Sequence, residues 1–592
     1  MKLSDYVADF LVRRGAKDVF LLPGGGCMHL VDSVGKRPEL RYVCCLHEQA
    51  CAFAAEAYGE YTNDLGCALV TAGPGGTNAL TGVACAWIES SPCLFLSGQA
   101  KRPDLMTAQP QRVRSMGQQE VDIVSLVGSV TKYAAQVSEP NDIRFHLEQA
   151  CWQAMHGRKG PVWLDIPLDV QSAQVEPERM RAFVPPAPAP EDFGPAIARI
   201  IETLAAARRP VLYASNGVRT AGMEEAFRSL AKRLGIPVLL TWKAADFLPE
   251  DHSCYVGRPG GIGQRAANFT QQKADWILVL GARLDLPSVA FNHGNFAPRA
   301  FRIVVDVDPA ELAKFRTGVD LPIGVDLARF LPILSAAEVR PPAQAGEWLE
   351  QCRGWVRRFP VVRPEHFRPP AGTISTYAFV DALSDLLAPG DVIVPGSSGP
   401  CSDIFYQAFR VRAGQRILNA PGLGAMGTGL PGTIGAALAS GRRVVNVNGE
   451  GGFQLNIQEL ETVRRLGLDA KYFVLDNGGY RSIVAMQRAH FQGRVVASEA
   501  SSGLTMPDTA RVAEAYGIPS LQVDDQACLR EVMAEALSRP GPLVCVVKTS
   551  VDEVTAPRVT SEIRPDGMIV SKRMEDMWPF LDRPEFEAIM RE

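Results

Sequence analysis

The chain has 592 residues, 46% of them hydrophobic and 21% charged, and its 61 basic and 65 acidic residues leave a formal net charge of −4. This composition indicates a folded protein of three or four domains and excludes a disordered chain, and the near-neutral charge argues against nucleic acid or an anionic membrane as a partner. The 13 cysteines are odd in number and scattered, which argues against a disulfide framework and favours a reducing compartment, the cytoplasm.

The chain from residue 1 to 183 alternates helical stretches with short apolar runs, the pattern of an α/β domain with a parallel sheet. A helix is expected around 54–59, and a buried strand at 68–71 runs into the glycines at 73–76. A further strand is expected at 160–164. The proline-rich stretch 184–190 cannot form a helix or a central strand, so it predicts a linker.

A second α/β domain is expected at 192–340. Four short β-branched runs predict buried parallel strands, and the segments between them suit crossover helices; the runs are 210–215, 236–241, 276–281 and 302–307. Proline pairs at 341–342 and 369–370 predict a second, looser linker between them.

Residues 557–592 form a tail whose apolar run 577–581 is expected to pack against the body. The chain from 371 to 556 repeats features of the first part. Gly73 and Gly449 follow predicted strands and lie 376 residues apart, and Gly160 and Gly541 precede strands and lie 381 residues apart. These offsets favour a duplicated domain, although any two α/β domains look alike at this level. Duplicated sheets commonly bind a ligand between the carboxyl ends of their strands.

The longest uncharged stretch is 417–441, and its glycines and prolines indicate a loop followed by a buried helix, not a membrane span. Within it, residues 422–427 fit the pattern G-x-G-x-x-G. No clear strand precedes this motif, so we expect a closely packed loop beside another ligand and not a dinucleotide site.

The strongest chemical signal lies between residues 444 and 480. One predicted strand leads into Gly449-Glu450-Gly451-Gly452, a helical stretch is expected at 456–466, and a second strand leads into Asp476-Asn477. This pattern places a carboxylate and a carboxamide side by side, with backbone N–H groups and a helix N-terminus around them. A divalent cation with a diphosphate needs such oxygen ligands and donors; two polar turns at a sheet edge are the alternative.

These residues carry a resemblance to a known family. Gly449-Glu450-Gly451, with Asn477 further along, resembles the thiamine diphosphate (ThDP) motif, which begins Gly-Asp-Gly and ends in Asn. The resemblance implies that Glu450, Asn477 and the backbone carbonyl of Gly479 hold Mg²⁺. Glu450 departs from the usual Asp by one methylene, and Mg²⁺ tolerates little distortion of its ligand octahedron.

The rest of the chain resembles the acetolactate synthase-like branch of the ThDP-dependent enzymes, in segments 46–50, 71–78, 160–167, 281–283, 305–309 and 422–431. The resemblance implies three doubly wound parallel-sheet α/β domains. The first (1–183) and third (371–556) would be a duplicated ThDP-binding fold, the pyrimidine and pyrophosphate domains. Between them would lie a Rossmann-like central domain (192–340) that binds FAD in several members, here at Arg283 and Asp306.

Glu48 is the catalytic residue that the resemblance implies. Its carboxylate would bond N1′ of the aminopyrimidine and favour the tautomer that removes the thiazolium C2 proton, while Met426 would hold the cofactor bent. The other implied cofactor-binding residues are Pro23, Gly24, Thr71, Pro74, Asn78, Ser397, Gly399, Gly424, Gly449, Gly451, Gly452 and Tyr480. Because Glu48 and the metal site come from different chains in this family, a homodimer or homotetramer with the active site at the subunit interface is implied.

The expected substrate pocket departs from the acetolactate synthase pattern. Gln118-Gln119-Glu120 replaces Phe-Gln-Glu, and Met486 stands where a Trp is usual, so Gln118, Gln119 and Met486 are the candidate substrate residues. The longer segment 101–116 carries Arg112 and Arg114, which would pair with a sugar-nucleotide phosphate or form a solvated face. Residues 283–287 lack the second Asp and the Arg of the usual FAD segment.

The leading hypothesis is a ThDP- and Mg²⁺-dependent transferase that decarboxylates a 2-oxo acid, pyruvate, and joins the product to a carbonyl acceptor. One alternative keeps the donor and uses a nucleotide-bound keto sugar or another ketone as acceptor. A second alternative is a non-catalytic binding partner whose metal site Glu450 has disabled. The presence of Glu48, Met426 and Asn477 together favours an enzyme.

Overall fold

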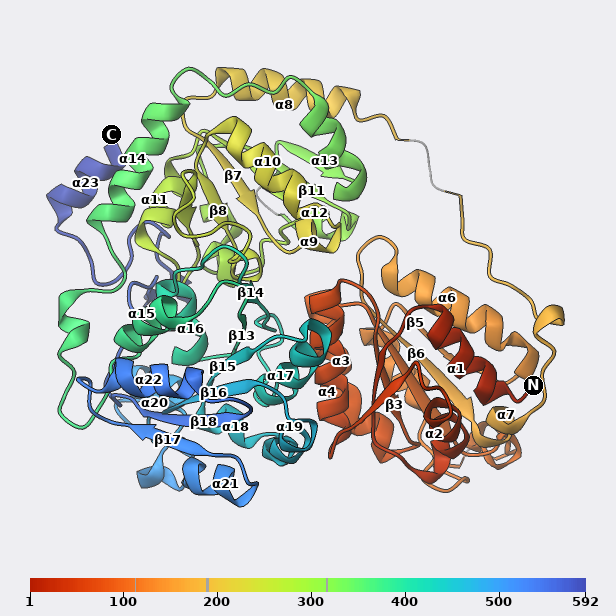
Figure 1. Cartoon of the computed structure of the whole chain (residues 1–592). Helices are drawn as coiled ribbons and strands as arrows, with labels where there is room; N and C mark the ends of the chain where they lie inside the picture. The colour runs from red at the N-terminus through yellow and green to blue at the C-terminus, as the bar shows by residue number, and fades with distance from the viewer. Residues whose placement is uncertain (112, 188–190, 316–317, 592) are drawn as a thin grey trace.

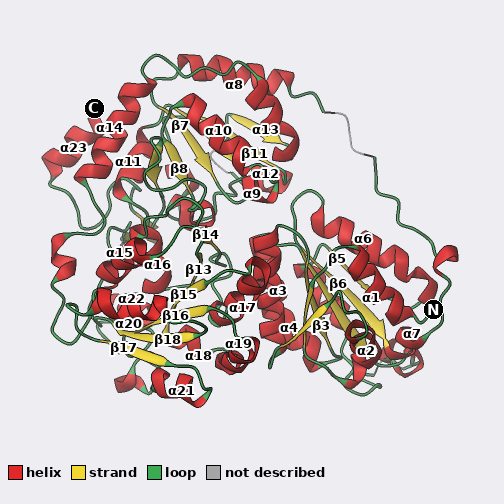
Figure 2. Cartoon of the chain, in the orientation of Figure 1, coloured by secondary structure: helices red, strands yellow, loops and turns green. Residues whose placement is uncertain are grey.

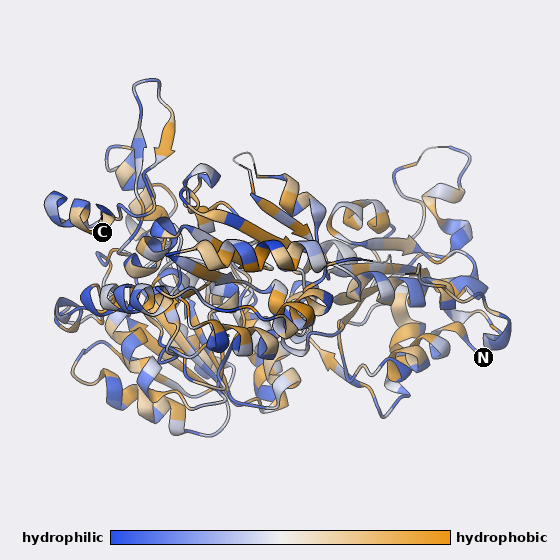
Figure 3. Ribbon diagram, turned by 90° about the horizontal axis from the view of Figure 1, so that it is seen from above, coloured by the Kyte–Doolittle hydropathy of each residue, from blue (hydrophilic) through white to orange (hydrophobic). Residues whose placement is uncertain are grey.

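The computed structural model describes residues 1–111, 113–187, 191–315 and 318–591. It contains three six-stranded sheets whose neighbouring strands all run parallel, with helices on both faces (Figures 1 and 2). The strands are rich in Val, Ile and Leu and are buried on both sides, as parallel sheets require. Figure 3 shows the same pattern, with hydrophobic strands inside and mixed helices outside. The structure confirms the α/β fold class.

The first sheet has the strand order β2-β1-β3-β4-β6-β5. Its strands are β1 (Asp18–Leu21), β2 (Arg41–Cys44), β3 (Gly66–Val70), β4 (Cys93–Gln99), β5 (Tyr133–Gln136) and β6 (Pro161–Pro167). Its helices are α1 (Leu3–Arg13), α2 (Met28–Gly35), α3 (Glu48–Thr62), α4 (Pro74–Glu89), α5 (Ile123–Val127), α6 (Ile143–Met155) and α7 (Leu168–Ser172).

The third sheet has the order β14-β13-β15-β16-β18-β17. Its strands are β13 (Val392–Pro395), β14 (Arg416–Ile417), β15 (Val444–Gly449), β16 (Ala470–Asp476), β17 (Ser520–Val523) and β18 (Leu543–Lys548). Its helices are α15 (Thr376–Leu386), α16 (Pro400–Ala408), α17 (Gly429–Ser440), α18 (Glu450–Gln454), α19 (Leu460–Leu466), α20 (Arg481–His490), α21 (Thr509–Ala515) and α22 (Leu529–Ser538). Taken along the chain, both sheets follow the order 2-1-3-4-6-5, which confirms the duplication.

The central sheet has the order β12-β11-β10-β7-β8-β9, a doubly wound Rossmann-like arrangement. Its strands are β7 (Pro210–Ala214), β8 (Val238–Leu240), β9 (Tyr255–Gly257), β10 (Trp276–Leu280), β11 (Phe301–Asp306) and β12 (Leu321–Gly324). Its helices are α8 (Gly194–Ala206), α9 (Gly217–Thr220), α10 (Glu224–Leu234), α11 (Arg265–Lys273), α12 (Pro309–Ala313), α13 (Leu327–Ala336) and α14 (Ala345–Arg358). The four strands expected in this part are all present.

Helices α3 and α17 join the first and third parts (Figure 1). Their facing residues are small, and a Cβ on Gly435 would lie 2.1 Å from the Ala54 carbonyl oxygen, so the two backbones approach closely. One hydrophobic core then runs through both parts, from Phe20 and Ala54 to Ile434 and Val444. This packing fixes the two duplicated sheets relative to each other.

Two expectations for the connections need correction. The segment 341–370 is not a loose linker, because α14 lies within it and packs Trp348, Cys352 and Trp355 into the core of the central part. The helix expected at 456–466 is shorter: α18 starts at Glu450, directly after β15, and a 3₁₀ turn, Ile457–Glu459, precedes α19.

The tail crosses back to the central part, with a hairpin of β19 (Ser561–Ile563) and β20 (Ile569–Ser571) and a last helix, α23 (Arg583–Arg591). Met577 is fully buried, and the backbone carbonyls of Met574 and Pro579 accept hydrogen bonds from the α11 side chains Asn268 and Arg265. Met577 therefore packs against the body, as expected of this run, whereas Phe580 is 43% exposed. Within the described ranges, no helix combines the length and apolar character needed to cross a membrane, and 417–441 forms a loop followed by α17.

Candidate active site

The pyrimidine-side candidates all follow the carboxyl ends of three adjacent strands in the first sheet. Glu48 follows β2, Pro23 and Gly24 follow β1, and Thr71, Pro74 and Asn78 follow β3. Because the strands are parallel, these residues share one edge of the sheet.

Glu48 begins α3, where its side chain is largely buried. Its Oε2 accepts a hydrogen bond of 3.0 Å from Nδ2 of Asn78, which lies one turn into α4. The His47 ring caps the same helix by accepting from the Gln49 N–H. The structure thus gives Glu48 a fixed orientation, and it pairs two residues that are 30 positions apart in the sequence.

The glycines of this edge are required by close contacts. A Cβ on Gly24 would lie 2.5 Å from Thr71, whose hydroxyl accepts from the Gly26 N–H. Gly73 has a φ of +59°, and a Cβ there would lie 2.3 Å from the carbonyl oxygen of Gln119. Only glycine is compatible with this backbone conformation and contact. Gln119 therefore lies directly over the turn that leads into Pro74.

The pyrophosphate-side candidates follow four adjacent strands of the third sheet. Gly424 and Met426 follow β14, and Ser397 and Gly399 follow β13. Gly449 ends β15, Glu450 to Gly452 begin α18, and Asn477 to Tyr480 follow β16. A Cβ on Gly451 would lie 2.3 Å from the Tyr480 ring, so these two candidates are in contact. The two duplicated sheets therefore present their candidate residues at equivalent edges.

Glu450, Asn477 and Gly479 converge at this edge. Oε1 of Glu450 accepts hydrogen bonds from the backbone N–H groups of Gly479 (2.7 Å) and Asn477 (3.3 Å). One terminal atom of the Asn477 amide lies 3.2 Å from Oε1 of Glu450 and 3.0 Å from the Gly479 carbonyl oxygen. The longer Glu side chain thus reaches the turn that an Asp would approach less closely.

This triad fits a magnesium ion. If the Asn477 atom is nitrogen, it donates to both oxygens; if it is oxygen, three oxygens converge and need a cation between them. Ligand oxygens about 2.1 Å from an octahedral Mg²⁺ are separated by about 3 Å, which matches these spacings. No group of three His, Cys, Asp or Glu suited to a metal exists among the described residues, so a cation here would rely on the amide and carbonyl oxygens.

The protonation of Glu450 responds to the same surroundings. Burial raises the pKa of its carboxyl to about 7, against the opposing effect of the Gly479 and Asn477 N–H groups. A bound divalent cation would favour the ionised carboxylate. Binding of such a cation would therefore be coupled to the release of a proton from Glu450.

Met426 lies in the loop between β14 and α17, and 38% of its surface is exposed. The loop is fixed on both sides of this residue, because the Gly422 N–H donates to Glu89 and the Gly427 carbonyl accepts from Asn456. Gly424 and Gly427 have φ of +66° and +90°. The loop is held at both ends, but it is less closely packed than the sequence predicts, because none of residues 421–426 is buried.

The candidate substrate residues lie at the surface of the chain. Gln118 and Gln119 are exposed, and Met486 lies on the exposed face of α20. Arg114 is exposed, and Arg112 lies outside the described residues.

Sequence reasoning missed the role of Glu120, which is buried and accepts hydrogen bonds from the backbone of Met106, Met116 and Gly117. Its carboxylate thus ties the backbone at Met106 to the backbone at Met116 and Gly117.

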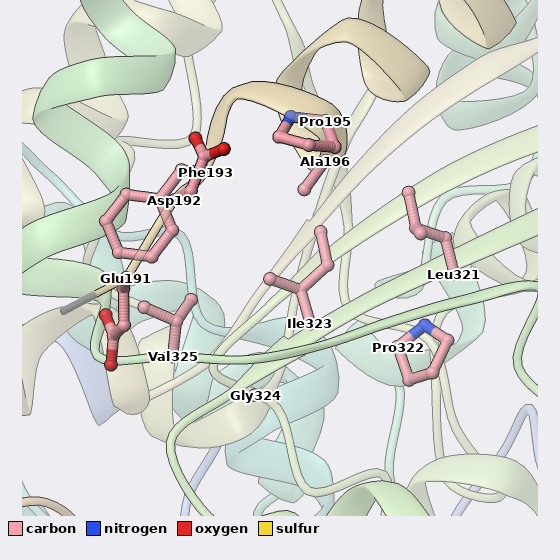
Figure 4. A pocket seen from close by; sticks show the side chains of 10 residues that line it. All are labelled: Glu191, Asp192, Phe193, Pro195, Ala196, Leu321, Pro322, Ile323, Gly324 and Val325. Atoms are coloured by element: carbon pink, nitrogen blue, oxygen red, sulfur yellow. The ribbon is translucent and has the colours of Figure 1, made fainter. Parts of the chain in front are cut away.

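The candidate FAD residues already have protein partners. Arg283 donates to the Ile88 carbonyl and pairs with Asp285, and Oδ1 of Asp306 accepts from the Asp308 N–H. Burial raises the pKa of Asp306. A cavity of about 470 Å³ lies elsewhere in the central part, where the start of α8 passes β12, and none of its lining residues belongs to the candidate site (Figure 4).

Family models match all three parts of the chain. The thiamine pyrophosphate enzyme N-terminal TPP binding domain matches residues 1–126, the central domain of the same enzymes matches 197–334, and their C-terminal TPP binding domain matches 397–547. The chain is therefore a ThDP-dependent enzyme, since thiamine pyrophosphate and ThDP are the same cofactor.

Comparison with individual relatives shows to which branch of the ThDP-dependent enzymes the chain belongs. The chain is 31% identical to an acetolactate synthase of Arthrospira platensis, over 93% of this chain and 94% of the relative. It is 30% identical to the acetolactate synthase isozyme 1 large subunit of Escherichia coli K12, over 94% and 95% of the two chains. The chain belongs to the acetolactate synthase family, which confirms the resemblance found in the sequence.

Proposed function

We propose that the protein decarboxylates pyruvate and transfers the resulting two-carbon unit to a carbonyl acceptor, with a second pyruvate as the simplest acceptor. The observation that carries the proposal is the pair of matching sheet edges, one with the Glu48–Asn78 hydrogen bond and one with the Glu450, Asn477 and Gly479 triad. The names of the relatives favour this activity over transfer to a keto sugar and over a non-catalytic role.

Each residue has a role in this proposal. When bound, ThDP supplies an acidic carbon and an electron sink for decarboxylation. Asn78 holds Oε2 of Glu48, which leaves Oε1 to exchange a proton with the pyrimidine ring. Glu450, Asn477 and the Gly479 carbonyl would hold Mg²⁺, and Met426 would support the cofactor from the loop after β14.

We also propose a homodimer or homotetramer with the active site between subunits. Tyr42 lies in β2 and Leu46 between β2 and Glu48, and about half of each side chain is exposed, 54% and 50%. Large apolar side chains exposed next to a catalytic residue favour a partner surface. Sedimentation of the purified protein measures the assembly.

The experiment that tests the activity is incubation with ThDP, Mg²⁺ and pyruvate, following CO₂ and acetolactate together. Equal amounts of both products support self-condensation of pyruvate. CO₂ without acetolactate would show that the donor half-reaction works and that another acceptor is used. Failure to consume pyruvate, with ThDP bound, would contradict the proposal.

Two further parts of the proposal have separate tests. FAD would bind beside Arg283 and Asp306, and flavin absorbance of the purified protein tests this directly. A cytoplasmic location is consistent with 13 cysteines that are all free, 11 of them buried and only Cys528 exposed. Cell fractionation measures it.

A further inference from the structure

The three parts of the chain meet at a buried cluster of charged side chains that lies outside the site described above. Helix α3 supplies Glu56 and Glu60, and α4 supplies Glu89. The central part supplies Lys243, from the 3₁₀ turn Trp242–Ala244, and the third part supplies Arg416, which pairs with Glu60. We name the first four of these residues the junction cluster.

Lys243 is the cation at the centre of the junction cluster. Its side chain is 11% exposed, and its Nζ lies 2.8 Å from Oε2 of Glu60 and 3.5 Å from Oε2 of Glu89. The same Nζ donates to the backbone carbonyl of Asn419 at 2.6 Å. One side chain of the central part therefore connects two helices of the first part to the loop of the third part.

Glu89 holds the same loop from the other side. Its Oε1 accepts from the Gly422 N–H at 2.5 Å, so Lys243 and Glu89 together fix the backbone at residues 419 and 422. A Cβ on Gly422 would lie 2.7 Å from Oε1 of Glu89, so the loop approaches α4 too closely for a side chain at this position. Gly424 and Met426 follow directly. The position of Met426 thus depends on residues of the other two parts.

A small cavity adjoins the junction cluster. It has a volume of about 20 Å³, is lined by Glu56, Glu60, Asn419 and Thr428 among others, and has room for about one water molecule. Nδ2 of Asn419 is buried there and has no hydrogen-bond partner among the described residues. The polar side chain of Asn419 is therefore buried at the residue whose carbonyl Lys243 holds.

We propose that Lys243 is a positioning residue for the loop 419–427 and, through that loop, for Met426 beneath the cofactor. The inference rests on the proposed function, since the loop matters for catalysis only if Met426 supports ThDP. Lys243 touches neither cofactor nor substrate in this proposal. It acts by holding the Asn419 carbonyl and by neutralising the carboxylates that flank the loop.

The test compares Lys243→Met with Arg158→Met. Arg158 is a matched control because it also links the first and central parts, through Asp308 and Glu311, but does not contact the loop. Hydrogen exchange of peptides covering 419–427, measured without cofactor, reports the loop directly. We expect faster exchange in Lys243→Met alone. With ThDP, Mg²⁺ and pyruvate, we expect kcat to fall by about tenfold or more in Lys243→Met, with KM changed less than threefold.

Two further variants keep the test decisive if Lys243→Met folds poorly. Glu60→Gln combined with Lys243→Met removes the charge that Lys243 neutralises, and the loop should still exchange fast because the Asn419 carbonyl is not held. Lys243→Arg keeps a donor and should recover part of the protection. Unchanged exchange of 419–427 in folded Lys243→Met, or full activity in the double variant, would overturn the proposal. Wild-type protein that does not consume pyruvate would refute the proposed function instead, and the exchange measurement would still decide the positioning.

Discussion

The side-chain amide of Asn78, in α4, donates a hydrogen bond to the carboxylate of Glu48, at the start of α3. The pair links two helices that follow different strands, and it fixes which carboxylate oxygen remains for the cofactor. Replacing Glu48 by Gln keeps an acceptor for Asn78 but removes the base. We expect turnover to fall by at least about a hundredfold.

Titration with ThDP and Mg²⁺ should show that Glu48→Gln binds the cofactor within about threefold of wild type, because the metal triad is untouched. Asn78→Ala leaves the base in place without its partner and should lose less activity than Glu48→Gln. Activity of Glu48→Gln equal to wild type would contradict the role of Glu48.

Glu450→Gln should weaken the magnesium dependence of ThDP binding. The change preserves the side-chain length that reaches Gly479 but removes the charge that a divalent cation needs. We expect the Mg²⁺ concentration for half-maximal ThDP binding to rise by about tenfold or more, as measured by calorimetry. Glu461→Gln is the control, since Glu461 lies on α19 and pairs with Arg464 at the surface. Equal shifts in both variants would argue against a metal ligand at Glu450.

Glu56→Gln should make stability less dependent on pH. Burial raises the pKa of Glu56 from 4.5 to about 8, and the nearby carboxylates of Glu60 and Glu89 act in the same direction. The Lys243 ammonium and a hydrogen bond from the Ser91 hydroxyl oppose this shift. Between pH 4.5 and 8 the folded protein holds a proton that the unfolded chain has released, so stability falls as pH rises through this window.

We therefore expect Glu56→Gln to match wild type near pH 5 and to be more stable near pH 8.5, by on the order of a few kcal/mol. Urea unfolding at both pH values measures the difference. A variant that loses as much stability as wild type over this range would show that Glu56 titrates normally.

Gly435→Ala should destabilise the protein through the α3–α17 contact. The new Cβ would lie 2.1 Å from the Ala54 carbonyl oxygen, and a backbone atom cannot move aside without separating the helices. Overpacking of this kind costs about 1–3 kcal/mol. Gly346→Ala, in α14 with open space around it, should be neutral or slightly stabilising. Thermal unfolding of the two variants compares them, and equal Tm values would contradict the close approach.

The sequence allowed the sheets to be predicted because buried parallel strands are continuous apolar runs between helices, as at Trp276–Leu280. It also located Glu450 and Asn477, since both directly follow such strands. The helix α14 was missed because proline pairs flank it, although Trp348, Cys352 and Trp355 have helical spacing. The contacts of Glu120 and Lys243 could not be predicted, because each depends on residues brought together only by the tertiary structure.

The first and third parts share one hydrophobic core, so they form one folding unit although the central part separates them in the sequence. During synthesis, the apolar face of α3 is complete long before the ribosome reaches α17, which covers it. The central part has its own hydrophobic clusters and can fold before α17 is synthesised. Its helix α11 gains its last contacts only when the tail has been made. A ribosome-bound chain that ends before residue 429 would therefore expose α3 and should be the form most readily captured by chaperones.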